Sequence, residues 1–269
     1  MLTEKSARIA HAHRLLRRTR RTEAGEFLAE GAQAVREAIG YQTENPGTVL
    51  DLFVTEAAAT RNTGLIRLAF AAGIEVTQVT DRAAAAMSDT QAPQGIVARC
   101  RTIEVDLATA LAGSPKLVAV LVQTNDPGNA GTIIRLADAV GADAVVVAGD
   151  AVDPFNPKVV RASTGSLFHL PIARSDDPAT LLEKLAAAGL STLATTGGAE
   201  LDLDTARSDG LLELPTAWLF GSEAHGLPAE IIAAADAAVR VPIHGRAESL
   251  NMATAAAVCL YASAGAQRG

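Results

Sequence analysis

Aromatic residues and cysteine are scarce in this 269-residue chain. Aromatic residues make up 3% of it, whereas hydrophobic residues make up 49%, with alanine prominent among them. Such a composition favours helix-rich α/β packing over an aromatic-rich β-sandwich. The two cysteines, Cys100 and Cys259, are too few and too far apart for a disulfide framework or a metal site. We therefore expect both to be small buried residues, and we expect no metal.

The chain also lacks a long apolar run. No stretch approaches the roughly 20 residues that span a bilayer. The first residues are charged and polar, which is not how a signal peptide begins. We expect a soluble, cytoplasmic protein without membrane contact.

Basic residues are fewer than acidic ones, and the formal net charge is −7. Taken alone, this argues against a nucleic-acid partner. The basic residues are unevenly placed, however, and the first 21 residues contain seven of them beside one acid: Lys5, Arg8, Arg14, Arg17, Arg18, Arg20 and Arg21. Such a run can bind RNA phosphates, or it can be a solvated helix face or a frayed terminus, and the sequence leaves both readings open.

The first hundred residues have the pattern of a small α/β domain. Apolar spacing predicts helices at 27–39 and 65–72. Short extended runs predict strands at 50–55, 74–79 and 96–99.

A second domain follows a break in the pattern between residues 101 and 115, so we place the domains at 1–105 and 106–269. It opens with unbroken apolar runs at 117–122 and 144–148, which are typical of parallel strands covered on both faces. Further strands are expected at 191–194, 216–220 and 239–243, and helices at 131–140, 178–188, 228–235 and 250–262. This alternation predicts an α/β domain with a mostly parallel sheet.

Three loops that follow predicted strands contain the candidate functional residues, and ligands of open α/β sheets bind at that edge. The first loop, residues 125–135, has Gly128 and Gly131 for close backbone approach, and it leads into a helix N-terminus that favours an anion. It matches neither the dinucleotide fingerprint nor the P-loop, so a nucleotide or sugar-phosphate enzyme loses support. Arg135 is either functional or an ordinary surface arginine.

The second and third loops have the same placement. In residues 219–228, Gly221 could let the backbone pass close to a ligand, and Glu223 is either a hydroxyl-binding group or a solvated acid. In residues 241–254, Ser249 is a plausible N-cap. Asn251 is a poor helix former, so its amide must gain a cap-like bond or a ligand contact.

Together and in this order, the three loops resemble the signature motifs of the SpoU (TrmH-like) RNA methyltransferases of the SPOUT class. Residues 160–171, with Arg161-Ala162-Ser163, resemble a further stretch of that family. Residues 27–31 and 90–95 resemble the substrate-binding domain of its ribosomal members, which is similar to a ribosomal protein of the L30e type. The resemblance covers nearly the whole chain.

The resemblance implies a C-terminal trefoil-knotted α/β domain, a smaller N-terminal L30e-like α/β domain, and a homodimer with the active site near its interface. The residues that it places in the catalytic machinery are Asn129, Arg135, Glu223, Ser249 and Asn251. Those that it places around the cofactor S-adenosylmethionine are Thr195, Gly221, Ile243 and Leu250.

The implied activity is 2′-O-ribose methylation of RNA. Ribosomal RNA of the 23S type is favoured because of the extra N-terminal domain, and we expect that domain and residues 1–21 to bind it. A tRNA methyltransferase and a non-catalytic RNA- or ribosome-binding protein are the alternatives. Arg135 is usually cast as the group that activates the hydroxyl, but a guanidinium holds its proton too strongly to be an ordinary base. We therefore expect Arg135 to clamp a phosphate and stabilise developing oxyanion charge.

Overall fold

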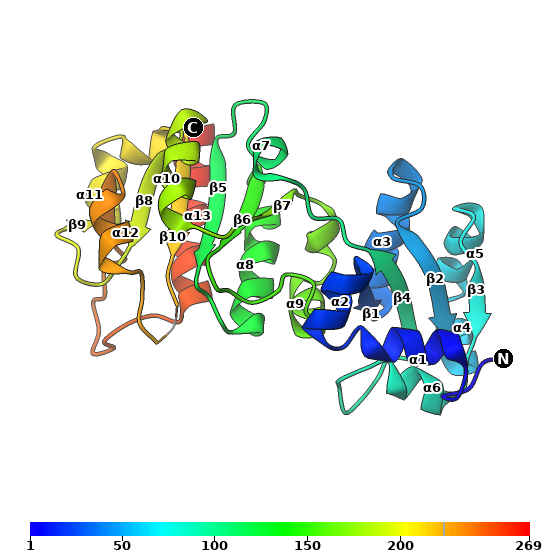
Figure 1. Cartoon of the computed structure of the whole chain (residues 1–269). Coiled ribbons are helices and arrows are strands. Elements are labelled where there is room, and N and C mark those ends of the chain that lie inside the picture. The colour runs from blue at the N-terminus through cyan, green and yellow to red at the C-terminus, as the bar shows by residue number, and fades with distance from the viewer. Residues whose placement is uncertain (223) are drawn as a thin grey trace. The chain divides into compact units, whose positions relative to one another are not determined.

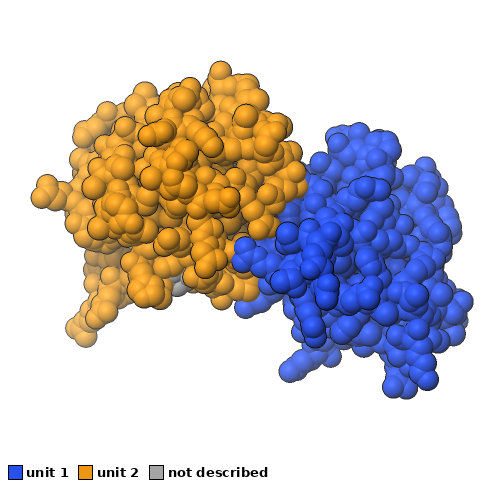
Figure 2. Space-filling view, viewed as in Figure 1, with its two compact units in different colours: residues 1–103, 153–169 blue, residues 104–152, 170–269 orange. Residues whose placement is uncertain are grey.

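A computed structural model describes residues 1–222 and 224–269 in two compact units (Figure 2). The first unit consists of residues 1–103 and 153–169, and the second of residues 104–152 and 170–269. The predicted domain boundary lies two residues after the observed one, and residues 153–169 pack with the first unit and not with the second.

The second unit is built on a sheet in which every pair of neighbouring strands is parallel (Figure 1). In spatial order its described strands are β7 (Ile172–Ser175), β6 (Ala144–Ala148), β5 (Leu117–Val122), β10 (Thr216–Phe220), β8 (Ser191–Thr195), β11 (Ala237–Arg240) and β9 (Leu201–Asp202). The α/β class with a mostly parallel sheet is thereby confirmed. The trefoil knot stays a prediction.

Helices cover both faces of this sheet. They are α7 (Leu107–Ala110), α8 (Pro127–Ala139), α10 (Pro178–Ala187), α11 (Leu203–Ser208), the 3₁₀ turn η2 (Leu211–Glu213), α12 (Ala229–Ala234) and α13 (Met252–Arg268). Along β10, Ala217 and Leu219 belong to the core cluster that includes Leu185 of α10. The buried Trp218 points the other way and donates its indole N–H to Ser263 of α13 at 2.8 Å. Burial on both faces explains why this strand reads as an unbroken apolar run.

The first unit has a smaller sheet with the order β1 (Glu26–Glu30), β4 (Ile96–Arg101), β2 (Val49–Val54) and β3 (Val76–Gln78). The β2–β3 pair is parallel, and β4 is antiparallel to both of its neighbours. The helices of this unit are α1 (Ala7–Arg14), α2 (Arg18–Ala24), α3 (Ala32–Glu44), α4 (Glu56–Arg61), α5 (Thr63–Ala71), α6 (Asp81–Ala86), α9 (Pro157–Ser163) and the 3₁₀ turn η1 (Ser166–Phe168).

The basic N-terminal residues belong to a docked segment with helices α1 and α2 and not to a frayed terminus. Ile9, Ala12 and Leu15 of this segment are buried in one core cluster with Phe53 and Val97 of the sheet. The hydrophobic effect therefore fixes the position of α1.

Several element boundaries differ from the sequence predictions. The helix predicted at 27–39 is wrong at its start, because Glu26–Glu30 is a strand and Gly31, with φ of 98°, separates it from α3. The strand predicted at 239–243 ends at Arg240, and residues 241–251 are irregular. Within the described residues, no helix is long and apolar enough to cross a membrane, and no three His, Cys, Asp or Glu side chains gather as a metal site.

Candidate active site

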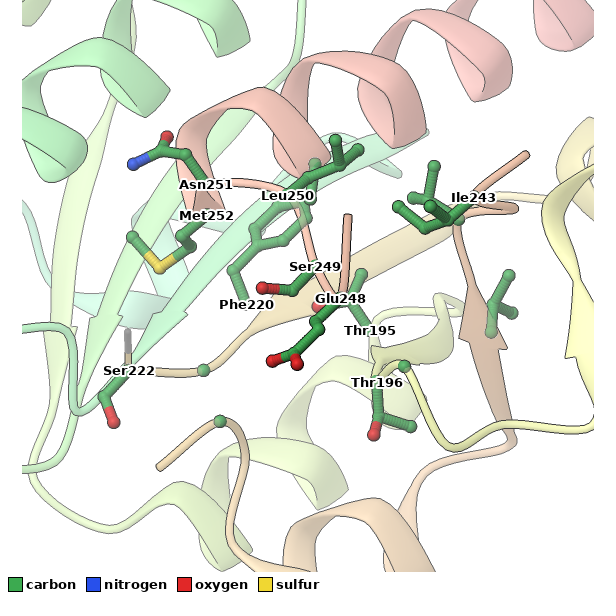
Figure 3. A pocket seen from close by; sticks show the side chains of 16 residues that line it. Thr195, Thr196, Phe220, Ser222, Ile243, Glu248, Ser249, Leu250, Asn251 and Met252 are labelled. Atoms are coloured by element: carbon green, nitrogen blue, oxygen red, sulfur yellow. The ribbon is translucent and has the colours of Figure 1, made fainter. Parts of the chain in front are cut away.

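A pocket of about 430 Å³ lies beyond the carboxyl ends of β8, β10 and β11 (Figure 3). Three segments line it: residues 195–197 after β8, the loop after β10, and the irregular segment 241–251 with the start of α13. Six of the predicted site residues line this one pocket: Thr195, Gly221, Ile243, Ser249, Leu250 and Asn251. Three segments that are far apart in the sequence therefore share one cavity. They include the second and third predicted loops, whereas no residue of the first loop lines it.

The pocket wall is held together at the end of β8. The Thr195 hydroxyl donates to the carbonyl oxygen of Leu219 in β10 at 2.8 Å. This bond fixes two strand ends side by side where the loops begin, so that Thr195 has a structural role in the wall.

The loop after β10 closes on itself. The Ser222 N–H donates to the Gly226 carbonyl at 3.0 Å, and the Gly226 N–H donates back to the Ser222 carbonyl at 2.8 Å. A Cβ atom on Gly221 would lie 2.2 Å from backbone atoms of Gly226 and Leu227, so no side chain fits there. Glu223, predicted as catalytic, lies outside the described residues. His225 is exposed and does not line the pocket.

The third segment exposes apolar side chains and backbone at the rim. Ile243 and Leu250 are 37% and 36% exposed although both are large and apolar. In the described part of the chain, no hydrogen bond uses the backbone N–H groups of residues 243–250. The rim thus offers both apolar surface and free hydrogen-bond donors to a ligand.

Asn251 is the N-cap of α13, and the prediction that Ser249 caps this helix is wrong. The Asn251 Oδ1 atom accepts from the N–H groups of Ala253 at 2.9 Å and Thr254 at 3.3 Å. The helix begins at Met252, two residues after the predicted start. Ser249 lies before the cap, and its hydroxyl has no hydrogen-bond partner among the described residues.

A hydrogen bond joins the first and third loops. Asn251 Nδ2 donates to Asn129 Oδ1 at 3.1 Å. Asn129 lies in the first turn of α8, where its N–H donates to the N-cap Asp126 at 2.8 Å. Two predicted catalytic residues, 122 positions apart, are therefore direct partners beside the pocket.

Within its own chain, Arg135 lies apart from the bonded pair Asn129–Asn251. It is exposed on α8, does not line the pocket, and has no hydrogen bond or ion pair with another described residue. It follows Asn129 by six residues, which places it about 240° around the helix. The guanidinium is accordingly available to a ligand outside the chain.

Several lining residues were not predicted from the sequence, among them Thr196, Gly197, Phe220 and Met252. The glycine pair that begins at Gly197, directly after a predicted strand, was a signal that could have identified this part of the wall. Phe220 and Met252 give no comparable signal, because apolar residues at element ends are usually core residues.

Comparison with known proteins identifies the family of each of the two regions of the chain. The sequence model of the SpoU rRNA methylase family matches residues 116–261, and that of the MRM3-like substrate-binding domain matches residues 6–98. A Bacillus subtilis protein named 23S rRNA (guanosine(2553)-2′-O)-methyltransferase RlmP is 33% identical over 96% of each chain. A Streptomyces viridochromogenes protein named 23S rRNA (uridine(2479)-2′-O)-methyltransferase is 32% identical over 97% of this chain and 90% of that one.

Solved structures agree. The SpoU methyltransferase AviRb from Streptomyces viridochromogenes, in complex with the cofactor AdoMet, superposes with a TM-score of 0.81 at 33% identity, over 98% of this chain and 99% of that one. Fold and pocket together define a methyltransferase of the SPOUT class. The chain belongs to the SpoU rRNA methylase family, which confirms the resemblance seen in the sequence.

Proposed function

We propose that this enzyme methylates a ribose 2′-hydroxyl of 23S-type ribosomal RNA with S-adenosylmethionine. The observation that carries the proposal is the bonded pair Asn129–Asn251 beside a pocket at the strand ends, in a chain that matches 23S rRNA 2′-O-methyltransferases over nearly its whole length. An rRNA substrate would make the cytoplasm the place of action.

The pocket fits the proposed cofactor. Its volume of about 430 Å³ suits a small molecule of nucleoside size. The exposed Ile243 and Leu250 offer apolar surface to an adenine ring, and the free N–H groups of the 243–250 segment offer donors to its polar edges. Thr195 and Gly221 would complete the wall. When bound, S-adenosylmethionine supplies an electrophilic methyl group on a sulfonium.

The chain's own task is to align the ribose hydroxyl and to manage its proton. Alignment by fixed side chains contributes several kcal/mol by removing the entropy of encounter. The amides of Asn129 and Asn251 and the unpaired hydroxyl of Ser249 are neutral groups that can orient the incoming hydroxyl. We assign Arg135 to clamp the RNA backbone and stabilise charge on the ribose oxygen, and Glu223 to support the same site.

Replacing Arg135 with lysine tests the clamp, because lysine keeps the charge and loses the bidentate fork. We expect Arg135→Lys to lose most turnover while its affinity for S-adenosylmethionine stays near that of the wild type. Single-turnover methyl transfer measures the loss of turnover, and calorimetric titration measures the affinity for the cofactor. Near-normal turnover would contradict the assignment.

A homodimer would bring Arg135 to a pocket that it does not reach in its own chain. The exposed face of α13 includes Val258 and Tyr261, which are 39% and 55% exposed and one turn apart. This apolar face lies on the helix that packs beside α8, and α8 carries Arg135. Association through α13 would bury the apolar residues and set α8 of one subunit near the site of the other.

RNA binding by the N-terminal residues is assigned to four of the seven basic side chains. Arg21 is 2% exposed and is paired with Asp153 at 2.7 Å, while Arg8 is paired with Asp51 and Glu75. Both therefore hold the fold together. The four exposed arginines where α1 meets α2 form what we call the arginine corner: Arg14, Arg17, Arg18 and Arg20.

The arginine corner is preorganised for phosphates. The buried Arg21 guanidinium donates to the carbonyl oxygens of Leu15 at 2.9 Å and Leu16 at 3.0 Å, which fixes the turn between the two helices. A cavity of about 350 Å³ at this turn is lined by Arg14 and Arg20. Arg20 is paired with Glu23 at 2.6 Å, an exposed pair that a phosphate can displace at small cost.

The variant Arg14→Gln/Arg17→Gln tests this surface, with Arg36→Gln/Arg67→Gln as a control that removes the same charge from exposed arginines elsewhere in the first unit. Fluorescence anisotropy with an unstructured RNA oligonucleotide at several salt concentrations measures affinity and salt slope. We expect the first variant to lower the slope by roughly 1.4, since each lost contact removes about 0.7 for a single strand. Equal slopes in the two variants would remove the arginine corner from the RNA interface.

The substrate class is tested by transfer of labelled methyl groups into separate pools of unmodified large-subunit rRNA, small-subunit rRNA and tRNA. We expect label in the large-subunit pool and loss of label with Arg135→Ala. Label in the tRNA pool instead would favour the tRNA alternative. No label in any pool, together with absent cofactor binding, would favour a non-catalytic RNA-binding protein.

A further inference from the structure

The pocket has an unusual distribution of charge. Among the described residues that line it, Glu248 is the only charged one, and the others are apolar, glycine or neutral polar residues. In Figure 3 its carboxylate extends into the space between Thr196 and Ser222. Glu248 is exposed and has no hydrogen bond or ion pair with another described residue. The described wall therefore contributes one uncompensated negative charge.

This charge is unsuited to the RNA. A carboxylate repels the phosphate backbone, and it neither caps a helix nor supports a strand here. The neighbouring Arg246 does not line the pocket. Glu248 is therefore placed to attract a positively charged ligand within the pocket itself.

The proposed reaction changes the charge of the pocket ligand. The ribose oxygen gains the methyl group, the electron pair of the broken sulfur–carbon bond stays on sulfur, and the hydroxyl proton leaves to water. S-adenosylmethionine carries a sulfonium, an ammonium and a carboxylate, so its net charge is one positive unit. S-adenosylhomocysteine, with a neutral thioether, has a net charge of zero.

We infer that Glu248 makes the pocket select the cationic cofactor over its neutral product. The inference rests on the proposed function, since it requires these two ligands to exchange at this site. The attraction is lost when the methyl group leaves, which favours product release and replacement by fresh cofactor. An exposed carboxylate acts through a high dielectric, so the expected preference is about 3- to 10-fold.

Calorimetric titration of the full-length protein with S-adenosylmethionine and with S-adenosylhomocysteine tests the inference. The variants are Glu248→Gln, which is nearly isosteric and neutral, and Glu183→Gln as a control for net charge, since Glu183 is an exposed acid of the second unit away from the pocket. We expect Glu248→Gln to bind S-adenosylmethionine about 3- to 10-fold more weakly and to bind S-adenosylhomocysteine within about twofold of the wild type. Glu183→Gln should leave both affinities unchanged.

Retained product affinity also shows that the variant pocket is folded. An equal loss for both ligands, or no loss for either, would overturn the inference while the proposed function stands. A wild-type protein that binds neither ligand would overturn the proposed function, and the inference with it.

Discussion

Gly221 shows how closely the backbone approaches itself at the pocket. Its virtual Cβ would meet backbone atoms of Gly226 and Leu227 at 2.2 Å, and backbone cannot give way as a flexible side chain can. Gly198 follows the pocket wall without lining the pocket, and a Cβ there would have no protein atom within 4 Å. The two glycines therefore form a matched pair for substitution.

We expect Gly221→Ala to shift the loop after β10, to cost about 1 to 3 kcal/mol of stability, and to weaken S-adenosylmethionine binding markedly. Gly198→Ala should leave both stability and cofactor affinity near those of the wild type. Thermal unfolding and calorimetric binding measure the two effects. Equal cofactor affinity in the two variants would show that the close approach does not shape the pocket.

Asn251 combines two roles that one substitution separates. Aspartate caps a helix as well as asparagine does, so Asn251→Asp keeps the acceptor for the N–H groups of Ala253 and Thr254. It loses the amide donor to Asn129 and sets an acceptor against an acceptor. We expect stability within about 0.5 kcal/mol of the wild type and a large loss of turnover, measured by urea unfolding and by single-turnover methyl transfer. Wild-type turnover would restrict Asn251 to capping.

Helix α1 is fastened to the sheet of the first unit by ion pairs as well as by its apolar face. Glu26 of β1 lies 2.7 Å from His11 of α1 and accepts a hydrogen bond from Arg99 of β4 at 2.7 Å. Burial raises the pKa of Glu26, but the bonds to His11 and Arg99 outweigh it and hold the pKa below its ordinary value of 4.5. The ionised carboxylate therefore stabilises the fold.

Because the pKa of Glu26 is lower in the folded state, its stabilisation is complete above pH 4.5 and is lost as the pH falls through the folded pKa. We expect wild type to exceed Glu26→Gln in stability by about 1 to 3 kcal/mol near neutral pH and to converge with it in acid. Urea unfolding over a pH series gives both curves. For Glu44→Gln, at an exposed acid of α3, the plot of unfolding free energy against pH should run parallel to that of the wild type. A difference in unfolding free energy between wild type and Glu26→Gln that stays constant with pH would contradict the assignment.

At the same scale, buried strands were the easiest elements to predict from the sequence. The runs predicted at 117–122, 144–148 and 216–220 have the same bounds as β5, β6 and β10, because strands covered on both faces must be apolar throughout. Residues 27–29 were wrongly predicted as helical, because a short apolar run is compatible with both the helical and the strand period. β7 was missed because Arg174 and Ser175 interrupt its apolar character.

At the scale of the whole molecule, the packing of residues 153–169 with the first unit could not be predicted from the sequence. It depends on contacts between distant residues: Phe155 packs against Phe27 with ring centroids 4.9 Å apart, and Asp153 pairs with Arg21. Such pairings leave no periodic signal. That the three predicted loops lie at one edge was easier to predict, because all of them follow strands of one parallel sheet.

The central claim is 2′-O-methylation through the pocket that Asn129 and Asn251 adjoin. Its most direct test is alkaline hydrolysis of large-subunit rRNA that the enzyme has labelled, because a 2′-O-methyl group removes the hydroxyl that alkali needs for cleavage. We predict one linkage that resists cleavage and carries the label, and its absence after treatment with Asn251→Asp. Label that stays on RNA cleaved at every linkage would mean base methylation and would contradict this account.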